Sequence, residues 1–218
     1  MKAKDNIALV IGATGMTGKE LTMQLLKDER FSKVTVFVRR STGIHHEKLE
    51  ENIINFDSPS EWQDLVKGDV LFSALGTTLK KAGSKAAQYK IDVTHQYNFA
   101  KAASDNKVPV YVLISSAFTS LTSPFFYSRM KAELERDVSL LPFHCIHIFK
   151  PGPLWGQRSE KRTFEEINIK LIKLINRAGL LKKTRPLHSS ELAQAMISVS
   201  FHDQEGIQYY ELDEIFKL

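Results

Sequence analysis

The chain has little of what secreted, membrane-spanning and disulfide-stabilised proteins need. Its 218 residues include one cysteine, Cys145, which excludes a disulfide framework. No apolar stretch approaches the ~20 residues that a helix needs to cross a bilayer. The first apolar run begins at Ile7, which leaves no room for a signal peptide before it. From these absences we expect a cytoplasmic protein without a membrane segment.

Metal-ligand spacing and long runs of one charge are also missing. His144 and His147 fall on opposite faces of one expected strand, and no other histidines form a defensible site, so no metal is predicted. The formal net charge is +5, and the basic residues are scattered in runs no longer than pairs such as Lys80 and Lys81. Nucleic-acid binding is therefore a distant hypothesis, whereas a mild basic excess suits an anionic cofactor or substrate.

Short apolar runs alternate with helical patterns along the chain. Such runs indicate a parallel sheet buried on both faces, and right-handed connections make it a doubly wound α/β fold of the Rossmann type. We expect a single domain over 1–218, in which residues 151–218 form one wall of the substrate cleft. The predicted strands are 7–11, 34–38, 53–56, 70–74, 110–115, 144–149 and 208–212, and the predicted helices are 17–28, 60–67, 84–105, 127–139, 163–177 and 189–201.

The most informative stretch is IALVIGATGMTG, residues 7–18. An apolar strand runs into Gly12, Gly15 and Gly18, and a helical pattern follows. In this arrangement the first glycine allows a sharp turn, the second lets backbone N–H groups approach phosphates, and the third allows close packing of helix on strand. The helix N-terminus then faces the anion with a partial positive charge. The alternative is an ordinary glycine-rich turn, but the position after an apolar strand favours binding of a dinucleotide pyrophosphate.

The ends of the next strands bear on the choice of cofactor. The second strand ends in Arg39 and Arg40, with no acid beside them in the sequence. Guanidinium groups suit the 2′-phosphate of NADP(H), whereas NAD(H) is usually met by a carboxylate. We therefore expect NADP(H) rather than NAD(H), although two solvated arginines would look the same. Asp57, near the end of the third strand, either meets the adenine amine or caps a helix.

Tyr127 and Lys131 supply candidate chemistry at the start of a helix that follows Ser115 at the end of the fifth strand. Residues four apart share a helix face, and a nearby ammonium favours a phenolate. A tyrosine so placed can give a proton to a carbonyl oxygen or take one from an alcohol, while Ser115 hydrogen-bonds the same oxygen. Tyr97 and Lys101 have the same spacing but lie inside the preceding helix, so we interpret them as structural.

The combination of GATGMTG, VRR, ALGTT, SSAF, YSRMK and FKPGPLWG resembles the atypical short-chain dehydrogenase/reductase superfamily. Within it the chain is similar to an NAD(P)H-binding branch that includes Tat-interacting-protein-like members and proteins described as nucleoside-diphosphate-sugar epimerases. The resemblance covers nearly the whole chain. It implies a Rossmann fold, a nicotinamide cofactor and oxidoreductase chemistry.

Carried over by position, the resemblance also implies site residues. Tyr127 would be the acid/base, Ser115 its partner, and Lys131 would hold the nicotinamide ribose. The superfamily's fourth catalytic residue is an asparagine, and the matching position here is Asp92, which weakens the case for a complete proton relay. The implied cofactor-binding residues are Gly12, Thr14, Gly15, Met16, Thr17, Gly18, Arg39, Arg40, Leu75, Gly76, Thr77, Lys131, Pro151 and Gly152.

Two functional hypotheses follow. The leading one is an NADP(H)-dependent oxidoreductase that acts on a small carbonyl or alcohol substrate, because the tail is shorter than in enzymes of nucleotide sugars. The rival is a catalytically weak binding protein that senses NADPH and reports its redox state to a protein partner. The substituted Asp92 and the short tail keep this rival open.

Overall fold

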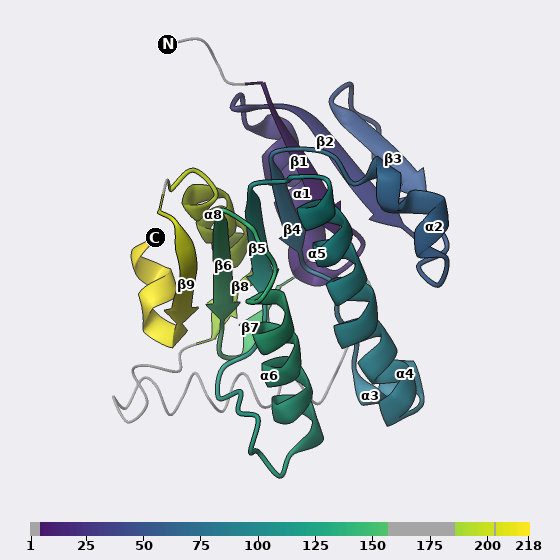
Figure 1. Cartoon of the computed structure of the whole chain (residues 1–218). Coiled ribbons are helices and arrows are strands. Elements are labelled where there is room, and N and C mark those ends of the chain that lie inside the picture. Colours follow the sequence, from purple (N-terminus) through teal and green to yellow (C-terminus); the bar gives the residue numbers. More distant parts are fainter. Residues whose placement is uncertain (1–4, 157–185, 203) are drawn as a thin grey trace.

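Seven parallel strands form the central sheet, in the order β3-β2-β1-β4-β5-β6-β9 (Figure 1). The computed structural model describes residues 5–156, 186–202 and 204–218. The chain moves from β1 outward to β3 and then returns to the other side of β1, so the order reverses between β1 and β4. In a doubly wound sheet the ligand lies at this reversal, beyond the carboxyl ends of the strands. The strands are β1 Asn6–Ile11, β2 Phe31–Val38, β3 Leu49–Ile53, β4 Val70–Ser73, β5 Val110–Ile114, β6 Cys145–Lys150 and β9 Gly206–Glu211.

Helices cover both faces of the sheet and divide the core into two apolar layers (Figure 1). One layer lies under α1 and α8, and the other under α5 and α6. Together they confirm the single doubly wound α/β domain expected from the sequence. The helices are α1 Met16–Lys27, α2 Pro59–Trp62, α3 Leu79–Ala82, α4 Lys85–Tyr89, α5 His95–Asp105, α6 Phe126–Val138 and α8 Ser189–Val199, with 3₁₀ turns at Gln63–Leu65 and Leu212–Lys217.

The apolar strands are the ones covered on both faces. Residues 8–11 of β1 are fully buried, as a continuous apolar run predicts for an inner parallel strand. The third strand differs, because β3 covers Leu49–Ile53 and not the predicted 53–56. It is an edge strand with charged and half-exposed residues, so it lacks the apolar run that marks its neighbours. Phe56, which the prediction placed in this strand, lies in a turn and packs on Phe99 of α5.

The long helix predicted over 84–105 is interrupted. After α4 the backbone forms a π-helical turn over Lys90–Thr94, and α5 then begins at His95. π-Helical turns are rare, and they occur frequently at functional sites. This one carries Asp92, the residue that stands where the resemblance implies an asparagine.

The C-terminal part of the chain contributes to the sheet and to its cover. Strand β9 pairs with β6, and α8 packs against α1, where the Gln24 amide donates to the Ser190 carbonyl over 3.0 Å. Strands β7 (Leu154–Trp155) and β8 (Leu187–His188) pair as a separate two-stranded sheet, which joins the segment after β6 to the segment before α8. The helix predicted over 163–177 lies outside the described residues.

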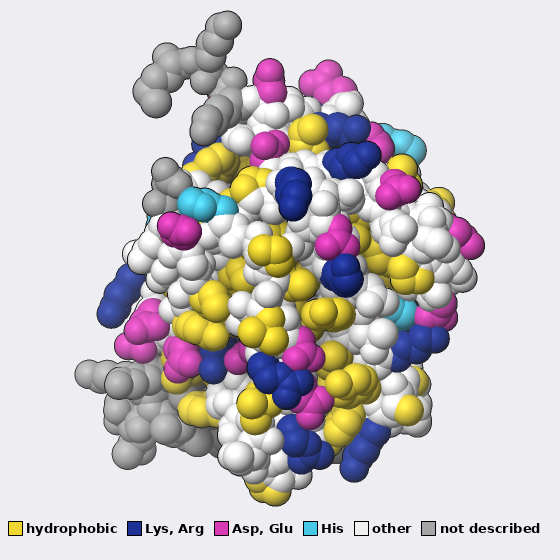
Figure 2. Space-filling view, in the orientation of Figure 1, with side chains coloured by type: hydrophobic (Ala, Val, Ile, Leu, Met, Phe, Trp, Pro, Cys, Tyr) yellow, Lys and Arg dark blue, Asp and Glu magenta, His cyan; other side chains and the backbone are white. Residues whose placement is uncertain are grey.

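Charged side chains are mixed on the outer surface. Figure 2 shows basic and acidic groups interspersed, with apolar side chains between them, on the face that carries α5 and α6. In the part of the chain that the structure describes, no helix combines the length and the apolar character needed to span a bilayer. Within the same ranges, no cluster of histidine, cysteine and acidic side chains is arranged to hold a metal ion.

Candidate functional site

The glycine turn after β1 packs directly on the end of β4. Gly12 has φ +86°, and a Cβ at this position would lie 2.4 Å from the carbonyl carbon of Ala74. A Cβ at Gly18 would lie 2.0 Å from the Gly12 carbonyl oxygen. Both contacts are with backbone atoms, which cannot move aside cheaply, so these two positions require glycine. Gly12 and Gly18 therefore let the turn pack closely against the end of β4 and against α1.

The start of α1 is built to receive an anion. Gly15 is the N-cap, and its own N–H closes the turn by donating to Gly12 O over 2.8 Å. No side chain caps the helix, and its first turn contains no acidic residue. Such a start, with backbone donors and the positive end of the helix dipole, matches a pyrophosphate. The cradle therefore fits the cofactor that the glycine spacing predicts.

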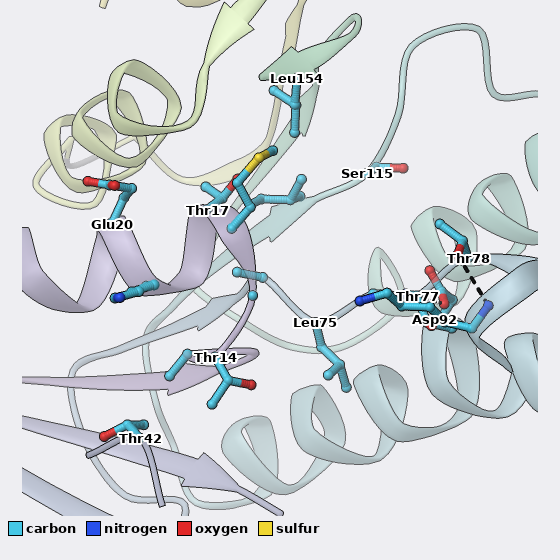
Figure 3. A pocket seen from close by; sticks show the side chains of 18 of the residues that line it. Thr14, Thr17, Glu20, Thr42, Leu75, Thr77, Thr78, Asp92, Ser115 and Leu154 are labelled. Carbon is cyan, nitrogen blue, oxygen red and sulfur yellow. Dashed lines mark hydrogen bonds between the residues drawn. The ribbon is translucent and has the colours of Figure 1, made fainter. Parts of the chain in front are cut away.

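A cavity of about 750 Å³ opens at this point and extends from the end of β2 to α6 (Figure 3). The side chains that face it include Thr14 from the glycine turn, Thr17 from the start of α1, Leu75 and Thr77 from the segment after β4, and Asp92. The cavity thus lies where the strand order reverses. The predicted site residues that line it are Thr14, Gly15, Met16, Thr17, Arg40, Leu75, Gly76, Thr77, Ser115, Tyr127 and Lys131.

Other predicted site residues lie near the cavity without lining it. Gly12 and Gly18 make the close packing just described. Pro151 is buried just after β6, where its carbonyl accepts from Ala117 N over 2.9 Å. A Cβ on Gly152 would meet Leu212 of the C-terminal turn, 3.5 Å away. Among the described residues after β6, Leu154 reaches the cavity wall.

The two arginines after β2, Arg39 and Arg40, take different positions relative to the cavity. Arg40 lines the cavity together with Ser41 and Thr42. Arg39 does not line it, and its charge instead acts on His95 at the start of α5. Burial lowers the pKa of His95, and the charges of Lys90 and Arg39 lower it further against the opposing effect of Asp57. Of the two guanidinium groups, Arg40 is therefore the one placed to meet a phosphate in the cavity.

An acidic residue, Glu51, lies beside the loop that carries Arg40, although no acid lies next to Arg40 in the sequence. Pairing of β3 with β2 brings Glu51 close, and its carboxylate accepts from the backbone N–H of Thr42 over 2.7 Å. Burial raises the pKa of Glu51, but hydrogen bonds from Ser41 and Thr42 outweigh it and hold the pKa below its ordinary value. The group is therefore a carboxylate at neutral pH. Sequence reasoning missed it because the acid comes from the neighbouring strand.

At the other end of the cavity, α6 presents Tyr127 and Lys131 one turn apart. The two side chains differ sharply in exposure. Tyr127 is 43% exposed at the mouth, whereas the Lys131 side chain is 4% exposed. The Lys131 ammonium lies 3.5 Å from Oδ1 of Asp92, whose side chain is 1% exposed. A buried ion pair thus occupies the end of the cavity that carries the tyrosine.

Asp92 is held in place from three sides. Its Oδ2 accepts from the backbone N–H of Thr77 over 2.9 Å. The Gln96 amide donates to the Asp92 carbonyl over 2.6 Å, and Gln96 is in turn held by the Ser73 hydroxyl over 2.6 Å. Burial raises the pKa of Asp92, although the Lys131 charge and the Thr77 hydrogen bond act in the opposite direction. The sequence singled out this position as a departure, but it did not predict the ion pair with Lys131.

Ser115 is engaged by a carboxylate as well. Its hydroxyl donates to Glu135 of α6, which also accepts from Thr119 over 2.9 Å and faces Lys150 at 3.6 Å. Because the Ser115 hydroxyl donates its hydrogen bond to Glu135, its oxygen is left to accept one. Sequence reasoning missed Glu135, although the spacing of Tyr127, Lys131 and Glu135 by four residues each places them on one helix face and would have identified it.

Comparisons with known proteins agree with this geometry. Residues 12–138 match a family described as NAD(P)H-binding. The chain is 33% identical over 195 residues to the mitochondrial protein FMP52 of Meyerozyma guilliermondii, covering 87% of this chain and 83% of the relative. It is 38% identical over 158 residues to the mitochondrial protein FMP52 of Saccharomyces cerevisiae, covering 71% and 68%. These names state no activity.

The fold is shared with solved nucleotide-binding enzymes. The crystal structure of the Bordetella bronchiseptica enzyme WbmG in complex with NAD superposes with a TM-score of 0.72 at 17% identity, covering 96% of this chain and 74% of that one. At this identity the likeness shows the Rossmann fold alone. The matching family supports a nicotinamide cofactor and does not separate NADP(H) from NAD(H).

The cytoplasmic location expected from the sequence is contradicted by these comparisons. The curated FMP52 relatives are named mitochondrial, and this finding overturns the cytoplasmic expectation. The expectation was wrong because a single cysteine and the lack of a long apolar stretch are compatible with several compartments. The other expectation from the motifs holds: the chain belongs to the family described as NAD(P)H-binding, with the FMP52 proteins among its relatives.

Proposed function

We propose that the chain is an NADP(H)-dependent oxidoreductase that reduces a small carbonyl compound or oxidises the corresponding alcohol. The observation that carries this proposal is that one cavity joins a helix start suited to a pyrophosphate, the guanidinium of Arg40, and the pair Tyr127 and Lys131. A chain that bound a nucleotide for another purpose would not need a tyrosine and a buried lysine at the far end of the same cavity.

Each part of the cavity has a separate task in this proposal. The N-terminus of α1 binds the pyrophosphate, and Arg40 with Ser41 and Thr42 binds the 2′-phosphate. The nicotinamide ring supplies or accepts a hydride when it is bound. Tyr127 donates its phenolic proton to the carbonyl oxygen as charge develops there. Lys131 holds the ribose from within the protein.

Ser115 takes a different part from the one that the sequence motif implies. Because its O–H donates to Glu135, its oxygen accepts a hydrogen bond from the tyrosine or from the product hydroxyl. It therefore orients the proton donor, and it does not itself stabilise a developing oxyanion. The small substrate fits a cavity of about 750 Å³, most of which the dinucleotide would fill.

The test combines binding and turnover. Purified protein is titrated with NADPH, NADP⁺, NADH and NAD⁺ by fluorescence or thermal shift, and a panel of carbonyl compounds is then screened for NADPH oxidation. Tyr127→Phe is expected to lower turnover by about 100-fold or more, the usual contribution of a general acid, and to leave NADPH affinity nearly unchanged. Unchanged turnover in this variant would remove Tyr127 from the chemistry, and binding of none of the four nucleotides would overturn the proposal.

A second candidate function has an observation in its favour. Two of the three candidate catalytic side chains, Ser115 and Lys131, are already paired with carboxylates, those of Glu135 and Asp92. A protein that binds NADPH and signals its redox state to a protein partner would tolerate this. Stoichiometric NADPH binding with no oxidation across a broad panel of carbonyl compounds would favour that function over catalysis.

A further inference from the structure

We infer that Asp92 is a positioning residue that sets the preference of the site between oxidised and reduced cofactor, because its carboxylate cancels the charge of Lys131 at the reacting end of the cavity. The inference rests on the proposed function, since it takes a nicotinamide cofactor as the ligand. It assigns a role to the position at which this chain departs from the superfamily's asparagine.

The cavity has a direction that places Asp92 at the reacting end. Arg40 lies at one end, the start of α1 lies between, and Tyr127 lies at the other end with Lys131 and Asp92. A dinucleotide with its phosphates at the α1 N-terminus and its adenosine toward Arg40 must extend its other half toward α6. The Asp92 carboxylate therefore belongs to the half of the site where the cofactor changes charge.

The carboxylate is fixed where it faces Lys131. The backbone N–H of Thr77 holds Oδ2, which leaves Oδ1 toward the ammonium at 3.5 Å. Gln96 anchors the π-helical turn beneath it through the Asp92 carbonyl. Figure 3 shows Asp92 directly beside Thr77 at the cavity wall. Neither side chain of the pair is more than 4% exposed, so solvent does little to screen their charges.

The two forms of the cofactor differ in charge at the nicotinamide ring. The ring is positive when oxidised and neutral when reduced, whereas the phosphates are the same in both forms. The neutral pair of Asp92 and Lys131 tolerates either ring, but an unpaired Lys131 ammonium would repel the positive one. In a poorly screened site a single uncompensated charge changes affinity substantially. Asp92 thus protects the binding of oxidised cofactor without affecting the phosphates.

Asp92→Asn is the direct test. Asparagine keeps the shape of the side chain and still accepts from Thr77, but it leaves Lys131 uncompensated. We measure Kd for NADP⁺ and for NADPH and take their ratio. The expected result is a rise in Kd(NADP⁺)/Kd(NADPH) of roughly tenfold, which corresponds to about 30 mV in the potential of the bound two-electron couple. Loss of packing alone would weaken both forms together and leave the ratio unchanged.

Two further variants keep the test sharp. The double variant Asp92→Asn with Lys131→Met removes both charges, and its ratio is expected to return to that of the unaltered protein. The double variant can also be measured if Asp92→Asn alone does not fold, because the double variant contains no unpaired buried charge. Asp105→Asn is the matched control, since it removes the acid of an exposed pair, 2.6 Å from Lys101, and should leave the ratio unchanged.

The measured Kd values distinguish a failure of the proposed function from a failure of the role assigned to Asp92. Binding of neither form by the unaltered protein would overturn the proposed function and this inference with it. Binding of both forms with the same ratio in the unaltered protein and Asp92→Asn would overturn the inference alone. If the single variant does not fold, a ratio in the double variant that differs from that of the unaltered protein would overturn it as well.

Discussion

The two ends of the cavity use charge in opposite ways. At the β2 end, Arg40 is exposed, and Glu51 is partly exposed and satisfied by hydrogen bonds from Ser41 and Thr42. At the α6 end, Asp92 and Lys131 are buried against each other. Water screens the first pair of charges and leaves each nearly independent, whereas the second pair is coupled. The exposed end can therefore gain or lose a ligand contact without consequence for folding, but the buried end cannot.

The largest expected effect is on stability at the buried end. Lys131→Met would leave the Asp92 carboxylate buried without its partner, and breaking a buried pair in this way costs about 3 kcal/mol or more. Chemical denaturation measures the free energy of unfolding. Arg40→Met at the exposed end and Lys101→Met in an exposed pair are the controls, each expected to change stability by less than about 0.5 kcal/mol. Equal losses in all three variants would abolish the contrast between the two ends.

The next effect is on cofactor affinity at the exposed end. Arg40→Ala is expected to weaken NADPH binding by roughly tenfold to a hundredfold, the value of a charge-assisted contact of about 1.5–3 kcal/mol, and to leave NADH binding nearly unchanged. Arg39→Ala is the matched control, because the neighbouring guanidinium does not line the cavity. Titration by fluorescence gives the Kd for NADPH and for NADH in the unaltered protein and in each variant. A larger loss in Arg39→Ala would reassign the phosphate contact to that residue.

The smallest effect is a difference in pH dependence between the two acids. Asp92 has a pKa raised above 3.8 by burial, so its contribution to stability is present below that pH and is lost as the pH rises through the raised pKa. Glu51, despite partial burial, has a pKa held below 4.5 by its hydrogen bonds. Its contribution is present above that pH and is lost as the pH falls through the lowered pKa.

The measurement is the unfolding free energy over a pH series for the unaltered protein, Asp92→Asn and Glu51→Gln. Relative to Asp92→Asn, the unaltered protein should lose stability as the pH rises. Relative to Glu51→Gln, it should gain stability over the same change, although by less because solvent screens the exposed end. Slopes of the same sign would show that burial does not distinguish the two carboxyl groups.

The sequence was most informative where chemistry is local. The glycine turn is decided by residues three apart, and the structure places Gly12, Gly15 and Gly18 as that spacing predicts. Covered strands such as β1 were recognisable because burial on both faces demands a continuous apolar run. The edge strand β3 was misplaced for the converse reason, since one side of it meets no neighbouring strand and its residues carry no such run.

The candidate site was predictable in part. The spacing of Tyr127 and Lys131 follows from helix geometry, and the structure brings both to the cavity with Ser115. The shared helix face of Tyr127, Lys131 and Glu135 could have pointed to Glu135 as well. The pairings themselves were not predictable, because Ser115 meets Glu135 across 20 residues and Lys131 meets Asp92 on another helix.

The sequence by itself determined the strand-turn-helix with its glycine spacing, the alternating order of elements and the family, because these depend on near neighbours in the chain. The tertiary structure decided which arginine enters the cavity, which acid lies beside it, and which carboxylates hold Ser115 and Lys131. The physical reason is that the charge and hydrogen bonding of a site depend on what lies within a few ångströms in space. In a doubly wound fold, those neighbours come from the ends of strands that are far apart in the chain.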